Sequence, residues 1–142
     1  MSARTKARKR ALDVLYSADL RQQPLPQALA VAAERAVNEP AREASWLYAR
    51  EILDGIVDHQ DEIDEQIETY AQGWTLARMP AVDRAILRIG VWELLFNDEV
   101  PDGVAISEAV EAATVLSTDD SAGFVNGLLA KIAQSQPKKK AQ

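Results

Sequence analysis

The sequence of 142 residues contains no cysteine and a single histidine, His59. Without cysteine the chain can form no disulfide, no thiolate nucleophile and no cysteine-based metal centre. The lone imidazole has no convincing serine or aspartate arrangement around it, so no nucleophilic triad is indicated. The six glycines are scattered, and neither a GxGxxG nor a GxxxxGKS/T motif occurs. We therefore expect no enzyme, no cofactor and no bound metal.

Long apolar runs are also absent, because no segment approaches about eighteen uninterrupted apolar residues. The basic N-terminus is followed by an amphipathic stretch that contains Asp13 and Asp19, and not by the apolar run of a signal peptide. We expect no membrane segment. Together with the lack of cysteine, which is typical of a reducing compartment, this predicts a cytoplasmic protein.

Acidic side chains surround the one histidine in the sequence, where Asp58, Asp61 and Glu62 are its near neighbours. A di-metal carboxylate site in a helix bundle uses about two histidines in Glu-x-x-His pairs on separate helices. One histidine cannot supply these pairs. We therefore interpret the cluster as the solvated face of a helix.

Apolar residues recur at helical spacing almost throughout the chain, and no sustained alternation of period two is present. The sequence therefore predicts an all-α fold of about seven helices, with breaks near prolines such as those in residues 22–27. The third helix is expected over about 41–57 and the fourth over 59–74. The helix that follows Pro80 is apolar on two sides, which predicts a central position. Its remaining strip carries Asp83, Arg84 and Arg88.

The last helix is expected to follow the capping segment "STDDS", residues 117–121. Its apolar stripe includes Phe124, Val125 and Leu128. Gly127 lies in the middle of this helix, where glycine costs roughly 1 kcal/mol relative to alanine. This cost predicts a close helix contact at Gly127.

Charge is divided unevenly along the chain, which has a formal net charge of −6. Residues 1–10 contain five basic side chains and no acid, and Lys138, Lys139 and Lys140 add three more at the other end. The rest of the chain therefore carries −14. A polyanion would meet the basic arm first, and the acidic body suits a basic partner. The alternative interpretation is an ordinary solvated surface whose basic ends keep the chain soluble.

Aromatic side chains near the basic arm strengthen the nucleic-acid hypothesis. Arginine and lysine neutralise phosphates, and a flat side chain such as Tyr16 or Phe124 can stack on an unpaired base. Spacing alone favours a place in the core for Phe124 over a role in stacking.

Four stretches resemble the NusB family of bacterial transcription antitermination factors. "KARKRALDVLY" (6–16) resembles the arginine-rich arm and first helix of the family. "VDRAILRIGVWEL", "VPDGVAISEAVEAA" and "STDDSAGFVNGLL" look like its C-terminal half, in the same order. The last of these is the most specific, because Phe-Val-Asn-Gly follows an acidic and serine-containing cap.

The resemblance implies a single helical domain over 10–135, made of two small packed bundles at about 10–74 and 75–135. From the residues themselves we expect a flexible basic arm over 1–9, ordered on binding, and a disordered basic tail over 136–142. The implied role is non-catalytic. It is to bind the boxA segment of nascent ribosomal RNA together with NusE, the ribosomal protein S-ten, in a complex with RNA polymerase and other Nus factors.

The resemblance also implies residue roles. The residues that would contact RNA phosphates and bases are Lys6, Arg8, Lys9, Arg10, Arg88, Asp120 and Phe124, with Phe124 as a stacking group. Tyr16 and Asp83 would contact NusE. Two other functions stay open: an accessory RNA-binding domain related to the N-terminal part of ribosomal RNA methyltransferases, and a purely protein-binding helical bundle.

Overall fold

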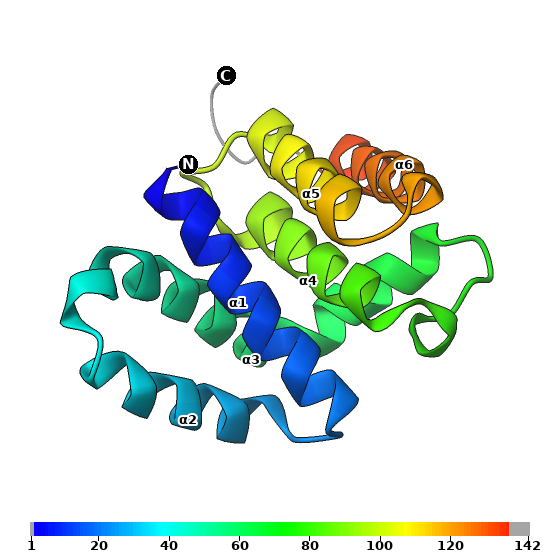
Figure 1. Cartoon of the computed structure of the whole chain (residues 1–142). Coiled ribbons are helices and arrows are strands. Elements are labelled where there is room, and N and C mark those ends of the chain that lie inside the picture. The colour runs from blue at the N-terminus through cyan, green and yellow to red at the C-terminus, as the bar shows by residue number, and fades with distance from the viewer. Residues whose placement is uncertain (1, 137–142) are drawn as a thin grey trace. The chain divides into compact units, whose positions relative to one another are not determined.

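The computed structural model describes residues 2–136 and, within them, only helices, turns and loops. The six α-helices are α1 (Ala3–Leu20), α2 (Leu25–Val37), α3 (Glu43–Tyr70), α4 (Ala81–Phe96), α5 (Asp102–Leu116) and α6 (Asp119–Ser135), and Figure 1 shows them in chain order. Two short 3-10 helices, η1 (Pro40–Arg42) and η2 (Leu76–Arg78), precede α3 and α4. The all-α prediction is confirmed. The basic tail from Lys138 to Lys140 lies outside the described residues.

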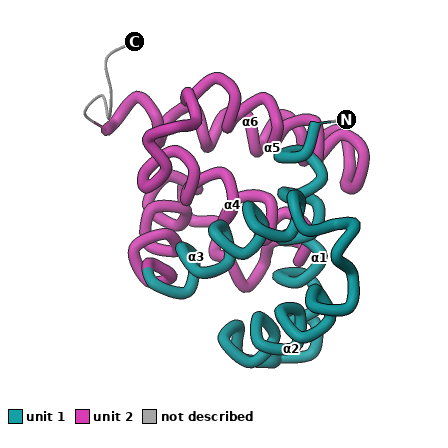
Figure 2. The backbone as a smooth tube through the Cα atoms, turned by 90° about the vertical axis from the view of Figure 1, so that its left-hand side faces the viewer, with its two compact units in different colours: residues 1–58 teal, residues 59–142 magenta. Residues whose placement is uncertain are grey.

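The structure has six helices where the sequence predicted about seven, because the predicted third and fourth helices are continuous in α3. Their junction survives as a kink at His59, whose φ of −128° and ψ of 25° are not helical. The chain separates into two compact units at this kink, residues 1–58 and residues 59–142 (Figure 2). The boundary therefore falls inside α3 and not near residue 74, because the second half of α3 belongs with the elements that follow it.

The two units differ in charge. Unit 1, residues 1–58, has nine basic and eight acidic residues, which is a net charge of +1. Unit 2, residues 59–142, has seven basic and fourteen acidic residues, which is a net charge of −7. Residues 11–58 contain four basic and eight acidic residues, so the net positive charge of unit 1 comes from its first ten residues. The larger part of the acidic charge lies in unit 2.

The N-terminal segment is helical from Ala3 onward, which differs from the flexible arm predicted for residues 1–9. Ser2 caps α1, since its Oγ accepts a hydrogen bond from the amide of Thr5 at 3.0 Å. Ala7 is fully buried, so α1 already packs against the core of unit 1 at its fifth residue. No acidic residue lies in the first turn of α1.

Unit 1 is built on the packing of α1 against α2 and on the first half of α3. The buried apolar residues of its helices are Ala7, Ala11, Leu12, Leu15, Ala18, Leu25, Leu29, Trp46, Tyr48, Ala49, Ile52, Leu53 and Ile56. The alanines on α1 are small, which allows close approach of neighbouring helices. Val14, which lies beside the buried stripe of α1, is only half-buried.

Unit 2 is built on α4, α5 and α6, which pack pairwise against one another. The central position predicted for α4 is confirmed, since residues on both of its apolar stripes, such as Ile86 and Leu87, are buried. Thr118 caps α6 by accepting a hydrogen bond from the amide of Ser121 at 3.1 Å, as the capping segment predicted. Within residues 2–136, no helix is both long enough and apolar enough to cross a membrane.

The close helix contact in unit 2 involves Gly90, and the prediction for Gly127 is wrong. A Cβ atom at Gly90 would lie 2.9 Å from Cδ1 of Leu129, so α4 approaches α6 where glycine leaves room. A Cβ atom at Gly127 would meet nothing within 4 Å, because Gly127 faces open space. Both glycines are in the middle of a helix, and only their neighbours distinguish them.

We predict opposite effects of alanine at these two glycines. Gly127→Ala should raise the free energy of unfolding by about 0.5–1 kcal/mol, because alanine has the higher helix propensity. Gly90→Ala should lower it by about 1–3 kcal/mol, because the added methyl group would overlap the fully buried Leu129. Urea denaturation of both variants measures the two changes. Equal stabilisation by both would contradict the close approach of α4 and α6.

Candidate nucleic-acid interface

The basic residues of α1 point to two different sides of the helix. At about 100° per residue, Lys6, Lys9 and Arg10 share one side, and Arg4 and Arg8 share another. The two sides have different surroundings within unit 1. The basic arm predicted from the sequence therefore contains two sets of cations, which lie on different sides of α1.

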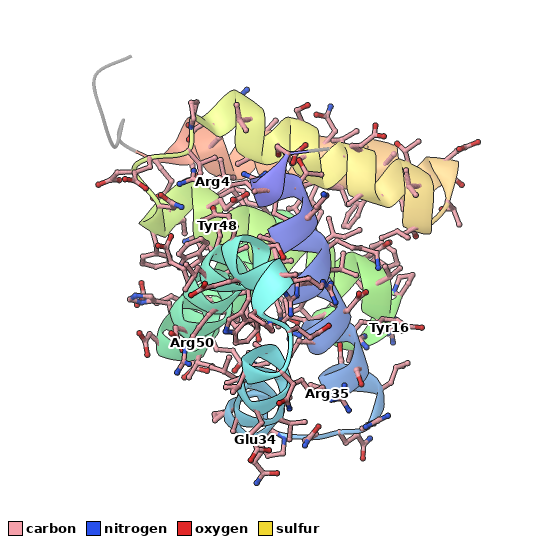
Figure 3. The ribbon with its side chains drawn as sticks, turned by 60° about the vertical axis from the view of Figure 1, so that its left-hand side comes forward. Arg4, Tyr16, Glu34, Arg35, Tyr48 and Arg50 are labelled. Atoms are coloured by element: carbon pink, nitrogen blue, oxygen red, sulfur yellow. The ribbon has the colours of Figure 1, made fainter. Side chains whose placement is uncertain are left out.

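Arg4 and Arg8 lie over the ring of Tyr48 in α3. Their guanidinium carbons are 4.5 Å and 5.7 Å from its centroid, which is the geometry of a cation–π contact. Figure 3 shows Arg4 from the first turns of α1 beside Tyr48. Tyr48 is itself buried. Arg8, which the family resemblance assigns to RNA, thus covers an aromatic side chain within unit 1.

Arg10 connects α1 to the segment that begins α3. Its Nη1 donates hydrogen bonds to the carbonyl of Arg42 at 3.0 Å and to Oγ of Ser45 at 3.1 Å. Its guanidinium also lies 5.5 Å from the ring centroid of Trp46. Burial, and after it the like charge of Arg42, lower the pKa of Arg10, while Glu39 acts in the opposite direction. Arg10 therefore supports the structure of unit 1 as well as its positive charge.

Lys6 and Lys9 are the exposed cations of this end of α1. They border a cleft that α1 forms with Ala44 and Ser45 at the start of α3. Lys9 forms an ion pair with Asp13, with 2.8 Å between Nζ and Oδ1. Both partners are exposed, so this pair contributes little to stability and can be exchanged for a phosphate.

The predicted stacking residue Phe124 belongs to unit 2 and is half-buried. Its ring makes an edge-to-face contact with Trp74, with 4.9 Å between the centroids and 71° between the ring planes. Trp74 is 37% exposed, and Asp120 is exposed one helical turn before Phe124. Trp74 was missed in the sequence, although an aromatic residue directly after Gly73, in a loop, is an available signal.

Arg88, also predicted to contact RNA, is already paired. Its Nε and Nη2 lie 2.9 Å and 3.2 Å from the two carboxylate oxygens of Asp64, which is a bidentate ion pair within unit 2. Both side chains are half-buried. RNA could use these two donors only by displacing Asp64.

The two residues expected to contact a protein partner lie in different environments. Tyr16 is 39% exposed, and Leu20, one turn later on α1, is 59% exposed. Together they form an exposed apolar pair in unit 1. Asp83 is only 1% exposed, so the prediction of an outer strip carrying Asp83 on this helix is wrong.

Asp83 is buried because α6 supplies a hydrogen-bond donor for it. Its Oδ2 accepts a hydrogen bond from Oγ of Ser121 at 2.8 Å, and its Oδ1 is buried with no hydrogen-bond partner among residues 2–136. A carboxylate in this position links α4 to α6. Its assignment to a partner contact stays a prediction.

The fold and these surfaces define a class: a small all-helical protein whose first helix carries a cation-rich end and whose second unit is acidic. Comparison with known proteins then identifies the family. The model of the NusB family matches residues 5–134. The chain therefore belongs to the NusB family, a non-catalytic family of transcription antitermination factors.

Relatives of known sequence and structure cover almost the whole chain. The transcription antitermination protein NusB of Leifsonia xyli subsp. xyli is 87% identical over 97% of this chain and 96% of the relative. The NusB of Clavibacter sepedonicus is 71% identical over 96% of this chain and 99% of the relative. A structure of T. maritima NusB superposes with a TM-score of 0.81 at 34% identity and covers 96% of this chain and 94% of that chain. A structure of the antitermination factors NusB and NusE in complex with dsRNA superposes with a TM-score of 0.79 at 30% identity, covering 96% of this chain and 99% of that chain.

We predict that Ser121→Ala lowers the free energy of unfolding by about 1–3 kcal/mol, because it leaves a buried carboxylate without its hydrogen bond. Ser107→Ala is the control, since Ser107 is exposed on α5. In an Asp83→Ala background the cost of Ser121→Ala should shrink, and chemical denaturation of the four proteins measures this coupling. An unchanged cost would contradict the bond between α4 and α6.

Proposed function

We propose that this protein binds the boxA segment of nascent ribosomal RNA as a single strand, together with NusE, the ribosomal protein S-ten. It then acts in the cytoplasm as part of an antitermination complex with RNA polymerase and other Nus factors. Family membership supports a role in antitermination, and the related structure of NusB and NusE with dsRNA supports RNA and NusE as the partners. The observation that carries the RNA part of the proposal is the exposed pair Lys6 and Lys9 on the cation-rich end of α1.

The preference for a single strand is supported by the aromatic pair of unit 2. An unpaired base can stack on an exposed ring, whereas the bases of a duplex are covered by their neighbours. Trp74 and Phe124 offer such rings, with Asp120 exposed nearby in the sequence as an acceptor for base N–H groups.

The helical state of α1 changes how RNA binding works. Because α1 is capped by Ser2 and held by Arg4 and Arg8 on Tyr48, its basic end is formed before RNA arrives. A preformed site loses less conformational entropy on binding than a segment that orders at that moment. The ordering of a flexible arm is therefore no part of the proposal.

We predict that Lys6→Ala/Lys9→Ala weakens binding of boxA RNA roughly ten- to thirtyfold at about 0.1 M salt and reduces the salt slope by about 1.4. Lysine is the better choice for the test than Arg8 or Arg10, because both arginines have contacts inside unit 1. Fluorescence anisotropy with labelled RNA, repeated over a series of salt concentrations, measures affinity and slope.

Two control variants accompany this test. Lys6→Arg/Lys9→Arg keeps the charge and should bind nearly as well as the wild type. Arg50→Ala removes an exposed cation that pairs with Asp54 on α3, away from the cleft, and should change RNA affinity little. Wild-type affinity of the lysine-to-alanine variant would count against RNA binding by α1 and favour the purely protein-binding bundle.

We predict that Tyr16→Ala weakens NusE binding about tenfold, because exposed aromatic side chains commonly carry much of an interface's binding energy. Leu47→Ala, which also removes an exposed apolar side chain from unit 1, is the control. Titration calorimetry with purified NusE measures the effect. Asp83→Lys is a poor alternative, because it would bury an unpaired ammonium group and report on folding. Equal affinity of the Tyr16 and Leu47 variants would remove Tyr16 from the proposed interface.

A further inference from the structure

Two clefts follow each other along α1, both within unit 1. The first is the cleft bordered by Lys6 and Lys9, with a volume of about 490 Å³. The second, of about 310 Å³, lies where α1 faces α2 and is bordered by Ser17 and Arg21 of α1 and by Arg35 of α2. The two clefts share Arg10, Asp13 and Arg42. They therefore adjoin at Arg10, whose guanidinium reaches from α1 to Arg42 and Ser45, and we call the two clefts together the α1 groove.

The sequence of α1 places a polar stripe along this groove. The residues of this stripe are the adjacent pair Lys9 and Arg10, with Lys6, Asp13, Ser17 and the C-cap residue Arg21 at steps of three or four residues. At about 100° per residue they fall within an arc of roughly 120° on one side of the helix. From Lys6 to Arg21 the helix rises about 22 Å.

The α1 groove is strongly basic. Its lining contains six basic residues and two acidic ones, for a net charge of +4: Lys6, Lys9, Arg10, Arg21, Arg35, Arg42, Asp13 and Glu39. The acids are already neutralised by neighbours, since Asp13 pairs with Lys9 and Glu39 pairs with Arg42 at 2.8 Å.

Three cations of the groove have no such compensation. Among residues 2–136, the side chains of Lys6, Arg21 and Arg35 form neither an ion pair nor a hydrogen bond, and all three are exposed. Lys6 stands near one end of the groove, and Arg21 and Arg35 stand in the other cleft. Figure 3 shows Arg35 and its neighbour Glu34 on different sides of α2, and Glu34 does not border the groove.

We propose that the α1 groove is an extension of the RNA site, in which Arg21 and Arg35 bind backbone phosphates of nucleotides that flank the segment held at Lys6 and Lys9. This inference rests on the proposed function and adds a second set of contacts on the same strand. Unpaired exposed arginines lose no internal bond when they bind a phosphate, and their fork geometry suits its oxygens. The site would act on phosphates and would therefore add affinity without reading sequence.

The groove fits a nucleic-acid backbone better than an acidic peptide. Its cations line two adjoining clefts, the first of which lies at the end of α1 that is already proposed to hold RNA. A bound peptide would require pockets for alternating side chains. Among the larger apolar residues of the lining, Trp46 is buried with the guanidinium of Arg10 over its ring, Val14 is half-buried and Val31 is exposed. A single exposed valine offers little anchorage for the side chains of a peptide.

The test compares Arg21→Ala/Arg35→Ala with the wild type on two RNAs. One RNA is the boxA segment alone, and the other carries about four additional nucleotides at each end, within the range that single-strand sites cover. The wild type should bind the longer RNA more tightly. The double variant should lose that gain, which corresponds to roughly ten- to thirtyfold at about 0.1 M salt, and its salt slope on the longer RNA should fall by about 1.4. Its affinity for the short RNA should match that of the wild type.

Two further variants separate contact from long-range attraction. Arg21→Lys/Arg35→Lys should retain most of the gain, because lysine still binds phosphate. Glu34→Gln changes the net charge by one beside Arg35 but outside the groove, so it should leave the difference between the two RNAs unchanged. If Glu34→Gln increased the preference for the longer RNA as much, per unit of charge, as the arginine substitutions reduced it, the effect would be one of general field, and the groove proposal would be overturned.

The outcomes distinguish this inference from the proposed function. If Arg21→Ala/Arg35→Ala binds both RNAs like the wild type while Lys6→Ala/Lys9→Ala fails, the groove proposal is wrong and RNA binding by α1 stands. If Lys6→Ala/Lys9→Ala also binds both RNAs like the wild type, the proposal that α1 binds RNA is wrong. If a polyglutamate peptide binds in a manner that requires Arg21 and Arg35 while the longer RNA does not, the groove belongs to an acidic protein partner.

Discussion

Unit 1 depends on contacts between arginines of α1 and aromatic rings at the start of α3. Arg4 and Arg8 cover Tyr48, and Arg10 lies over Trp46 while its guanidinium bonds to Ser45. Each cation–π contact of this kind contributes about 0.5–2 kcal/mol, depending on its burial. Since these contacts use the three arginines of the basic segment, its two lysines, Lys6 and Lys9, are left as the exposed cations. One short sequence thereby stabilises the fold and presents the charge that a polyanion meets.

The sequence predicted the helices well and the roles of individual cations less well, and the reason is physical. Helical periodicity, prolines and the cap at Thr118 depend on neighbours in the chain, and these features are visible without a structure. The contact of Arg8 with Tyr48 joins positions forty residues apart, so no local pattern could show it. The kink at His59 is a further example. The sequence marks a break there, but only the packing decides that both halves continue as one helix and that the units divide at this residue.

Burial separates residues that look alike in the sequence. Asp83 and Arg88 were both expected on the polar strip of α4. Asp83 is instead buried and accepts a hydrogen bond from Ser121, whereas Arg88 is half-buried and pairs with Asp64. Gly90 and Gly127 are both mid-helix glycines, yet one lies against Leu129 and the other faces open space. In each pair the difference arises from what the neighbouring helix provides. A helix's own sequence therefore identifies candidate site residues but not which of them are free to bind.

The absence of acid from the first turn of α1 has a thermodynamic consequence. The N-terminal end of a helix carries a partial positive charge from its unpaired amides, and cations placed there oppose it. In the free protein this end of α1 therefore carries an electrostatic penalty, offset by the Ser2 cap and by Tyr48. An anion bound at this end removes the penalty as well as adding its own contacts. Binding of an anion at this end should consequently slow amide hydrogen exchange in the first turns of α1 more than elsewhere in unit 1. The free energy of anion binding and the local stability of this part of α1 are therefore coupled.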